Sequence, residues 1–261
     1  WFKALLKADR MMSAEAPPQL GWRDRTITLT RWKNLVTPEG GQRVTITFAT
    51  FIKWISTPVT IDRVEGLETI LGGFSLAMFE GDYREAKRCL TLDALVLDYD
   101  KQVKLDTILS LWGGYAGVLH TTKKHTDAAP RCRVVLPYTR EVTPDEHARL
   151  WRWAVDRSVG QGQEVDKSTK DCSRFWFDPS KLAEAPYQVV ELSGALLNPD
   201  EVLAKPPANL AVLDFVLSKA SPGDELTVTR AEGARSPRDR SGPKAAPSFS
   251  LEQLLQEIAN A

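Results

Sequence analysis

The chain has 261 residues, of which 43% are hydrophobic and 26% are charged, and its formal net charge at pH 7 is zero. This size and composition predict a globular protein with a substantial core. A zero net charge excludes a general electrostatic grip on nucleic acid, so any such binding has to come from a local patch. No apolar run approaches the roughly 18–20 residues that cross a bilayer, and no signal-peptide pattern is found, which predicts a cytoplasmic protein without a membrane partner.

Strands and helices are predicted to alternate along the chain. In chain order they are a strand hairpin over 25–32 and 44–48, a short helix over 49–56, a loop with short ordered pieces over 61–90, a strand over 95–100, a helix over 105–112, strands over 115–120 and 133–136, a helix from 143, and strands over 174–177 and 187–192. The helix beginning at Thr143 has the strongest signal, because Thr143, Pro144 and Glu146 suit an N-cap, a first turn and a capping box. The pattern predicts an α+β fold, with helices packed on one side of a mixed sheet.

Composition predicts the domain boundaries. The breaker Lys205-Pro206-Pro207 follows the last strand, and residues 232–247 are rich in Pro, Gly, Ser, Arg and Lys without apolar periodicity. The predicted segments are an N-terminal extension over 1–24 that includes added or upstream sequence, a main domain over 25–200, an appendage over 201–230, a flexible linker over 231–248 and a short amphipathic helix over 249–261. The three cysteines, Cys89, Cys132 and Cys172, are widely spaced and predict buried thiols rather than disulfides or a zinc site.

Two acids separated by one residue end the apolar run 95–97. Side chains of a strand alternate between its faces, so Asp98 and Asp100 are expected on one face, about 6.5–7 Å apart along the chain. Carboxylates so close repel each other unless a cation lies between them, which indicates a divalent-metal site. The alternative is a strand that runs into an ordinary polar turn.

Residues 120–133 concentrate groups that bind phosphate. They include Lys123, Lys124 and His125 in a turn, and Arg133 at the start of an apolar strand. A guanidinium in that position has to reach a solvated cleft or an anionic partner. The alternatives are a solvated lysine-rich turn and a surface histidine.

A third cluster, before the predicted strand at 174, adds two acids. Asp166 or Asp171 could supply the third carboxylate that a two-metal site needs beside an Asp-x-Asp pair. Asp171 could instead orient Arg174 through a charge-assisted hydrogen bond. The alternative for each acid is an ordinary loop residue that caps a turn.

Taken in order, these motifs resemble the archaeo-eukaryotic primase superfamily. The resemblance extends over 25–196 and consists of an Asp-x-Asp that ends an apolar strand, Thr-Thr-x-x-His-Thr before Arg-Val-Val-Leu-Pro, and Asp-x-Ser-Thr-x-Asp-x-Ser-Arg-Phe. It is greatest for primase-polymerase domains in replication proteins of plasmids, phages and integrated mobile elements. The resemblance implies an RRM-like catalytic sheet, two Mg²⁺ or Mn²⁺ ions, and synthesis of primers or DNA.

The residue roles follow from the same resemblance. The first motif corresponds to Asp98 and Asp100, the second to His125 and the third to Asp166, and the three acids would hold two cations about 3.5–4 Å apart. The residues expected to bind nucleotide are Lys123, Lys124, His125, Arg133, Asp171, Ser173 and Arg174. Lys123 departs from the family pattern, which usually has serine two residues before the histidine.

The implied partners are nucleoside triphosphates, a single-stranded DNA template with its primer, and a replicative helicase domain or protein. A rolling-circle nuclease is a rival, but it needs a catalytic Tyr and a His-x-His pair, whereas His120 and His125 are too far apart for that pattern. A nucleotide- or nucleic-acid-binding module with a degenerate site is the non-catalytic rival, and Lys123 is the best argument for it.

Overall fold

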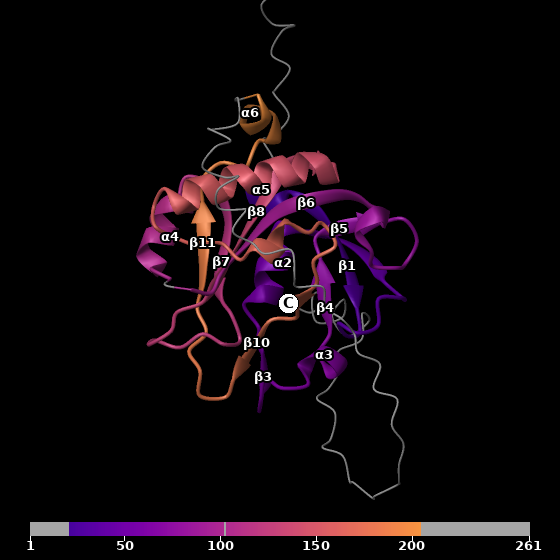
Figure 1. The fold of residues 1–261 in the computed structure, drawn as a ribbon, viewed down its shortest axis with the longest axis vertical. Helices are drawn as coiled ribbons and strands as arrows, with labels where there is room; N and C mark the ends of the chain where they lie inside the picture. The colour runs from indigo at the N-terminus through magenta and orange to yellow at the C-terminus, as the bar shows by residue number, and fades with distance from the viewer. Residues whose placement is uncertain (1–20, 102, 205–261) are drawn as a thin grey trace, which may run out of the picture.

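The computed structural model describes residues 21–101 and 103–204 (Figure 1). Most of the predicted N-terminal extension, nearly all of the appendage at 201–230, the linker and the terminal helix lie outside the described residues. Within them, no helix combines the length and the apolar character that crossing a membrane requires.

The longest elements of the fold are strands β6 and β8 and helix α5, and the others are shorter. In chain order the helices and strands are η1 (Trp22–Asp24), β1 (Thr26–Trp32), β2 (Gln42–Thr47), α2 (Phe48–Ile55), β3 (Val59–Ile61), α3 (Leu67–Ile70), β4 (Gly73–Ser75), β5 (Ala77–Phe79), η2 (Ala86–Arg88), β6 (Cys89–Tyr99), α4 (Leu105–Trp112), β7 (Ala116–Thr121), β8 (Cys132–Val142), α5 (Pro144–Val159), η3 (Lys167–Lys170), β9 (Trp176–Phe177), β10 (Ser180–Leu182), β11 (Val189–Ser193) and α6 (Pro199–Leu203).

A five-stranded sheet in the order β11-β7-β8-β6-β5 forms the centre of the fold. Strand β6, helix α4 and strand β7 make a split βαβ unit, because β8 inserts between the two strands and pairs antiparallel with both. This β6-α4-β7-β8 order is the RRM-like arrangement, so the predicted α+β fold is confirmed. Neighbouring strands of this sheet are all antiparallel, and the parallel pairing found among the described strands, between β10 and β3, lies outside it.

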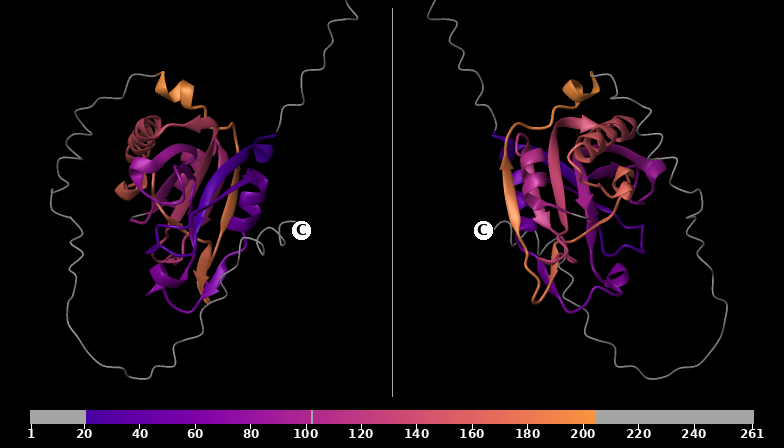
Figure 2. Two further views of the ribbon diagram at one scale, coloured as in Figure 1. Left: turned by 90° about the vertical axis from the view of Figure 1, so that its right-hand side faces the viewer. Right: turned by 60° about the vertical axis from the view of Figure 1, so that its left-hand side comes forward.

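Both faces of the central sheet are covered (Figure 2). Leu95, Leu97 and Tyr99 of β6 pack with helices α4 and α5 on one face. Ala94 and Val96 pack with β1 and α2 on the other, where a second sheet lies in the order β2-β1-β4-β9. A strand buried on both faces has no polar positions to alternate with, which explains the continuous apolar run that precedes Asp98.

Two local predictions have different outcomes. The capping box at the start of α5 is confirmed, since the Thr143 side chain accepts from the Glu146 backbone and the Glu146 side chain accepts from the Thr143 backbone. Pro137 was expected to end its strand, but β8 continues to Val142. Pro137 faces Ala94, beside the irregularity in the β6–β8 register, and there a residue without an N–H is tolerated.

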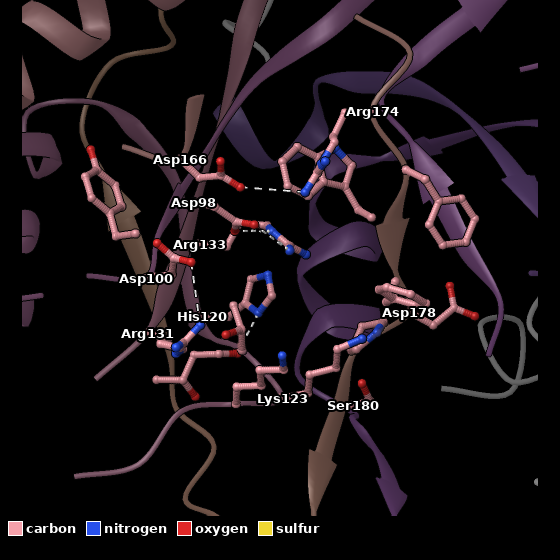
Figure 3. Close-up of a pocket in the computed structure, with 18 of the residues that line it drawn as sticks. Asp98, Asp100, His120, Lys123, Arg131, Arg133, Asp166, Arg174, Asp178 and Ser180 are labelled. Carbon is pink, nitrogen blue, oxygen red and sulfur yellow. Dashed lines mark hydrogen bonds and ion pairs between the residues drawn. The ribbon is translucent and has the colours of Figure 1, made fainter. Parts of the chain in front are cut away.

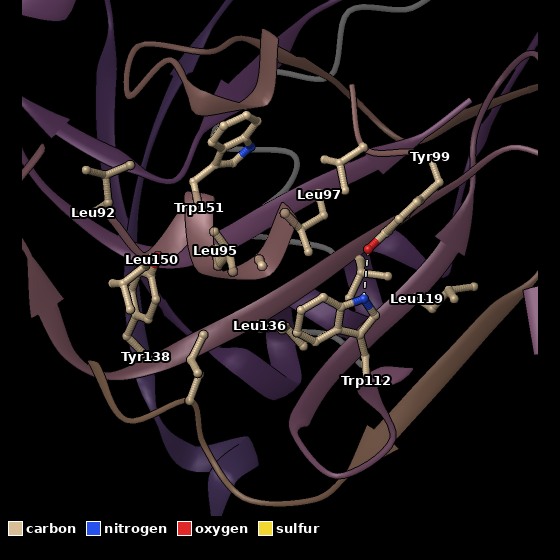
Figure 4. Close-up of a cluster of buried hydrophobic side chains, with 14 of the residues drawn as sticks. Leu92, Leu95, Leu97, Tyr99, Trp112, Leu119, Leu136, Tyr138, Leu150 and Trp151 are labelled. Carbon is tan, nitrogen blue, oxygen red and sulfur yellow. Dashed lines mark hydrogen bonds between the residues drawn. The ribbon is translucent and has the colours of Figure 1, made fainter. Parts of the chain in front are cut away.

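A buried hydrogen-bond network joins strand β6 to helices α4 and α5, and Figure 4 shows the bond between Tyr99 and Trp112. The Trp112 indole donates to the Tyr99 hydroxyl at 2.8 Å, and this hydroxyl lies 2.8 Å from the Ser158 Oγ. Ser158 donates its own proton to the Ala154 carbonyl, so Tyr99 donates to Ser158 and every group in the network is satisfied. The network anchors the strand residue that lies between Asp98 and Asp100.

Replacement of Tyr99 by Phe is expected to lower the free energy of unfolding by about 1–3 kcal/mol, because it leaves the buried Trp112 indole donor without a partner and removes the hydrogen bond that Ser158 accepts. Urea denaturation measures this change. Tyr83→Phe is the matched control, since Tyr83 is only partly buried and stacks against Arg88. Equal losses in the two variants would contradict the network's role.

Candidate active site

A cavity of about 360 Å³ opens where the apolar cores of strands β6, β7 and β8 end (Figure 3). Asp98 lies opposite Arg133 across β6 and β8, and Arg133 lies opposite His120 across β8 and β7. Each of the three is two residues from a buried side chain of the β1 and α2 face, namely Val96, Val135 and Val118. Because side chains two apart share a face, all three polar groups continue this face into the cavity.

The cavity brings together the three predicted metal ligands, Asp98, Asp100 and Asp166. Asp98 is near the end of β6 and Asp100 immediately follows it. Asp166 comes from the segment before η3, which is held to the same strand because its backbone N–H donates to the Asp98 carbonyl at 2.9 Å.

Each of these acids faces an arginine. Arg133 binds Asp98 through two hydrogen bonds of 2.8 and 3.1 Å. Arg131 lies 3.6 Å from Asp100, and Arg174 lies 3.7 Å from Asp166. The Arg133 guanidinium also lies over the Trp176 ring, 4.3 Å from its centre. The negative charge of the three acids is therefore compensated by Arg133 of β8, by Arg131 just before β8 and by Arg174 just before β9.

The donor set suits Mg²⁺ or Mn²⁺, because both prefer carboxylate oxygens. Within 21–101 and 103–204, however, no three His, Cys, Asp or Glu side chains lie close enough together to hold an ion. Asp100 is the most open of the acids, with 41% of its side chain exposed, against 17% for Asp98. The residues therefore fit a divalent ion in donor type, with arginines as the competing partners of the carboxylates.

Six of the seven residues expected to bind nucleotide line the cavity: Lys123, Lys124, Arg133, Asp171, Ser173 and Arg174. The ammonium of Lys123 lies 3.3 Å from the centre of the Phe177 ring. Burial, followed by the nearby positive charges of Arg133 and Lys124, lowers the pKa of Lys123 to about 8. Asp171 also caps its own turn, since its Oδ1 accepts from the backbone and the hydroxyl of Ser173.

His125 is the predicted nucleotide-binding residue that does not line the cavity. Its backbone N–H donates to the Thr122 carbonyl in a tight turn, and its ring is 2% exposed. The ring Nδ1 accepts from the Arg131 backbone N–H at 3.1 Å. In this arrangement the imidazole fixes the loop between β7 and β8 and supports Arg131.

The cavity also contains residues that were not proposed as site residues from the sequence. They are Leu35, Arg84, Tyr99, His120, Thr121, Thr122, Arg131, Phe175, Trp176, Phe177, Asp178, Pro179, Ser180 and Tyr187. His120 and Arg131 belong to the phosphate-binding segment 120–133 of the sequence analysis. His120 could have been found from the pairing of β7 with β8, which places it opposite Arg133. No sequence motif marks Arg84 or Asp178 as site residues, because only the packing of the folded chain brings them to the cavity.

Comparison with known proteins gives a family and one distant structural likeness. The model of the family described as the VapE N-terminal domain matches residues 21–208. No curated protein matches the chain. The archaeo-eukaryotic primase domain of the cyanophage S-2L primase-polymerase is a similar solved structure, with 12% identity and a TM-score of 0.38 over 69% of this chain and 88% of that one.

The Asp98–Arg133 pair is expected to show a coupling energy of about 1–3 kcal/mol in a double-mutant cycle of Asp98→Asn and Arg133→Gln, measured by denaturation. Its side chains are only 17% and 12% exposed, so solvent screens the pair weakly. The Lys101–Glu164 pair is the control, because its side chains are 66% and 56% exposed and its coupling should stay below about 1 kcal/mol. Similar coupling energies for both pairs would rule out a special role for Asp98–Arg133.

Proposed function

We propose that this chain, which belongs to the VapE N-terminal domain family, is a nucleotidyltransferase that makes primers on single-stranded DNA from nucleoside triphosphates. The observation that carries the proposal is the gathering of Asp98, Asp100 and Asp166 with a wall of lysines and arginines in one cavity. A nucleotidyl transfer needs this combination, since negative charge builds up on the phosphates while acids organise the reacting oxygens. Family membership supports a role in replication of a plasmid, phage or mobile element.

The cationic residues have a direct part in this proposal. Lys123, Lys124, Arg133 and Arg174 supply donors for the oxygens of a triphosphate. Arg133 and Arg174 are paired with Asp98 and Asp166, so phosphate binding competes with these ion pairs. When the arginines turn to the phosphates, carboxylate oxygens become free on the opposite side of the cavity.

Asp98, Asp100 and Asp166 are the residues that would hold the divalent ions. Both acids cap their own turns, since Asp166 accepts from the backbone and hydroxyl of Ser168 and Asp171 from those of Ser173. Asp166 is proposed as the third ligand because its backbone N–H donates to the Asp98 carbonyl, which ties its segment to β6. Bound Mg²⁺ or Mn²⁺ would neutralise phosphate charge and lower the pKa of the attacking hydroxyl. The contribution of the chain itself is to position the acids at the end of β6 and before η3.

A binding module without catalytic activity is the second candidate. It is favoured by the arginine partners of the three acids, which leave no three carboxylates clustered among the residues that the structure describes. The rolling-circle nuclease has less support. Its paired histidines are absent from the cavity, where His120 lies without His125, and the Tyr99 hydroxyl is held in the core by Trp112 and Ser158.

The template, the primer and a helicase domain or protein remain proposed partners. Phe177 lines the cavity and is partly exposed, so its ring is the proposed aromatic surface for the bases of a nucleotide or a template strand, whereas Trp176 is buried beneath Arg133. The residues that would lead to a following domain lie after position 204 and outside the described residues.

Asp98→Ala, Asp100→Ala and Asp166→Ala are each expected to reduce primer synthesis at least about 100-fold, because each removes a carboxylate that organises the reacting oxygens. The assay uses single-stranded DNA, labelled triphosphates and Mg²⁺ or Mn²⁺. Asp62→Ala is the matched control, since Asp62 is an exposed aspartate outside the cavity, and it should retain full activity.

The same assay separates the candidates. New primers from the wild type support the transferase, cleavage of the template supports the nuclease, and triphosphate binding without either product supports the module. Full synthesis by the Asp98→Ala variant would refute the assignment of this carboxylate.

Triphosphate affinity is expected to fall roughly tenfold as the pH rises from about 7 to 9, because Lys123, with its pKa lowered to about 8, loses its positive charge over this range. Calorimetric titration with ATP measures the effect. Lys123→Arg should bind equally well across the range, since a guanidinium stays charged, whereas Lys124→Arg should keep the wild-type dependence. A wild-type affinity that does not change with pH would mean that Lys123 does not contact the phosphates.

A further inference from the structure

His120 presents an unused hydrogen-bonding atom at the cavity. The side chain comes from β7, lines the cavity and is 3% exposed. Its Nε2 is buried and has no hydrogen-bond partner among the described residues. A buried polar atom without a partner costs free energy, so its presence in a cavity wall indicates a group that it serves when a ligand is bound.

The neighbours of the ring determine which nitrogen carries the proton. The Nδ1 atom lies 3.0 Å from the Thr121 carbonyl oxygen, which can only accept, so Nδ1 is the donor. The Tyr187 hydroxyl, 3.2 Å from Nδ1, donates its proton to the Ile55 carbonyl and can also only accept from the ring. Nε2 therefore has a free lone pair. Burial and the charge of Arg133 lower the pKa of His120 to about 3, which keeps the ring neutral.

A neutral Nε2 can accept a hydrogen bond and cannot donate one. Phosphate oxygens at neutral pH carry no proton for it, so this atom does not belong to the phosphate-binding set. In Figure 3 the ring lies between Arg133 and Lys123, two of the residues proposed to bind the triphosphate. In a nucleotide, the sugar is bonded directly to the phosphates and carries hydroxyl groups that can donate, so a sugar hydroxyl is the donor that Nε2 would meet.

We propose that His120 accepts a hydrogen bond from a sugar hydroxyl of the bound nucleoside triphosphate and is thereby a specificity-determining residue. The inference rests on the proposed function, since it takes a triphosphate as the ligand. The hydroxyl reaches Nε2 from within the cavity once Arg133, which lies opposite His120 in the strand register, turns toward the phosphates. Tyr187 and Thr121 then act as positioning residues that keep the lone pair of Nε2 available.

The test compares binding of ribonucleoside triphosphates with binding of their 2′-deoxy, 3′-deoxy and 2′,3′-dideoxy analogues, by calorimetry with Mg²⁺ and with all four bases. The wild type is expected to bind the analogue that lacks the recognised hydroxyl about tenfold or more weakly, because the acceptor is then left unpaired. His120→Leu should bind all the sugars within about twofold of one another. His120→Gln, whose amide oxygen can replace Nε2 as an acceptor, should restore part of the preference.

The comparison of sugar analogues with the wild-type protein needs no substitution, so it tests the inference even if His120→Leu or His120→Gln does not fold. Equal binding of all four sugars by the wild type, a preference that follows the base instead of the sugar, or a full sugar preference in a folded His120→Leu would overturn the inference. These outcomes leave the proposed function intact. A wild type that binds no triphosphate at all would overturn both.

Discussion

The ion pair between Asp98 and Arg133 is the interaction on which the site depends. Residues 92–97 of strand β6 are buried, so the carboxylate of Asp98 that follows them needs a partner from a neighbouring strand. The β6–β8 register supplies it by placing Arg133 directly opposite, and the same register places His120 on the far side of Arg133. The pairing of β6, β8 and β7 thus places a carboxylate, a guanidinium and a neutral imidazole side by side, namely Asp98, Arg133 and His120.

This order divides the cavity into parts with different chemistry. Asp98, Asp100 and Asp166 form the side at which divalent ions are proposed to bind, and the arginines that face them can turn to phosphates. Because each arginine has an anionic partner already, binding replaces one set of ion pairs by another and leaves no charge buried without compensation. The neutral ring of His120 lies beside this charged region and selects for a donor instead of an anion.

Local sequence patterns predicted the acids and most of the cations, because a charged residue that interrupts an apolar run is conspicuous. The same reasoning did not predict where His125 lies, since the residue type suggests a ligand but the Thr122–His125 turn decides where the ring points. It also failed for Pro137, because a register irregularity in β6 accommodates the proline within the strand. Arg84 and Asp178 reach the cavity only through tertiary packing, which no short window of sequence records.

The anchoring of Tyr99 has a consequence for how defects in this protein should be interpreted. Tyr99 separates Asp98 from Asp100 in the chain, and its hydroxyl is held by Trp112 of α4 and Ser158 of α5 on the opposite face of the sheet. The spacing and direction of the two carboxylates therefore depend on how the helical layer is packed. A small substitution deep in that layer would impair the chemistry while most of the molecule stays folded, so genetic screens for inactive alleles should also recover positions remote from the cavity.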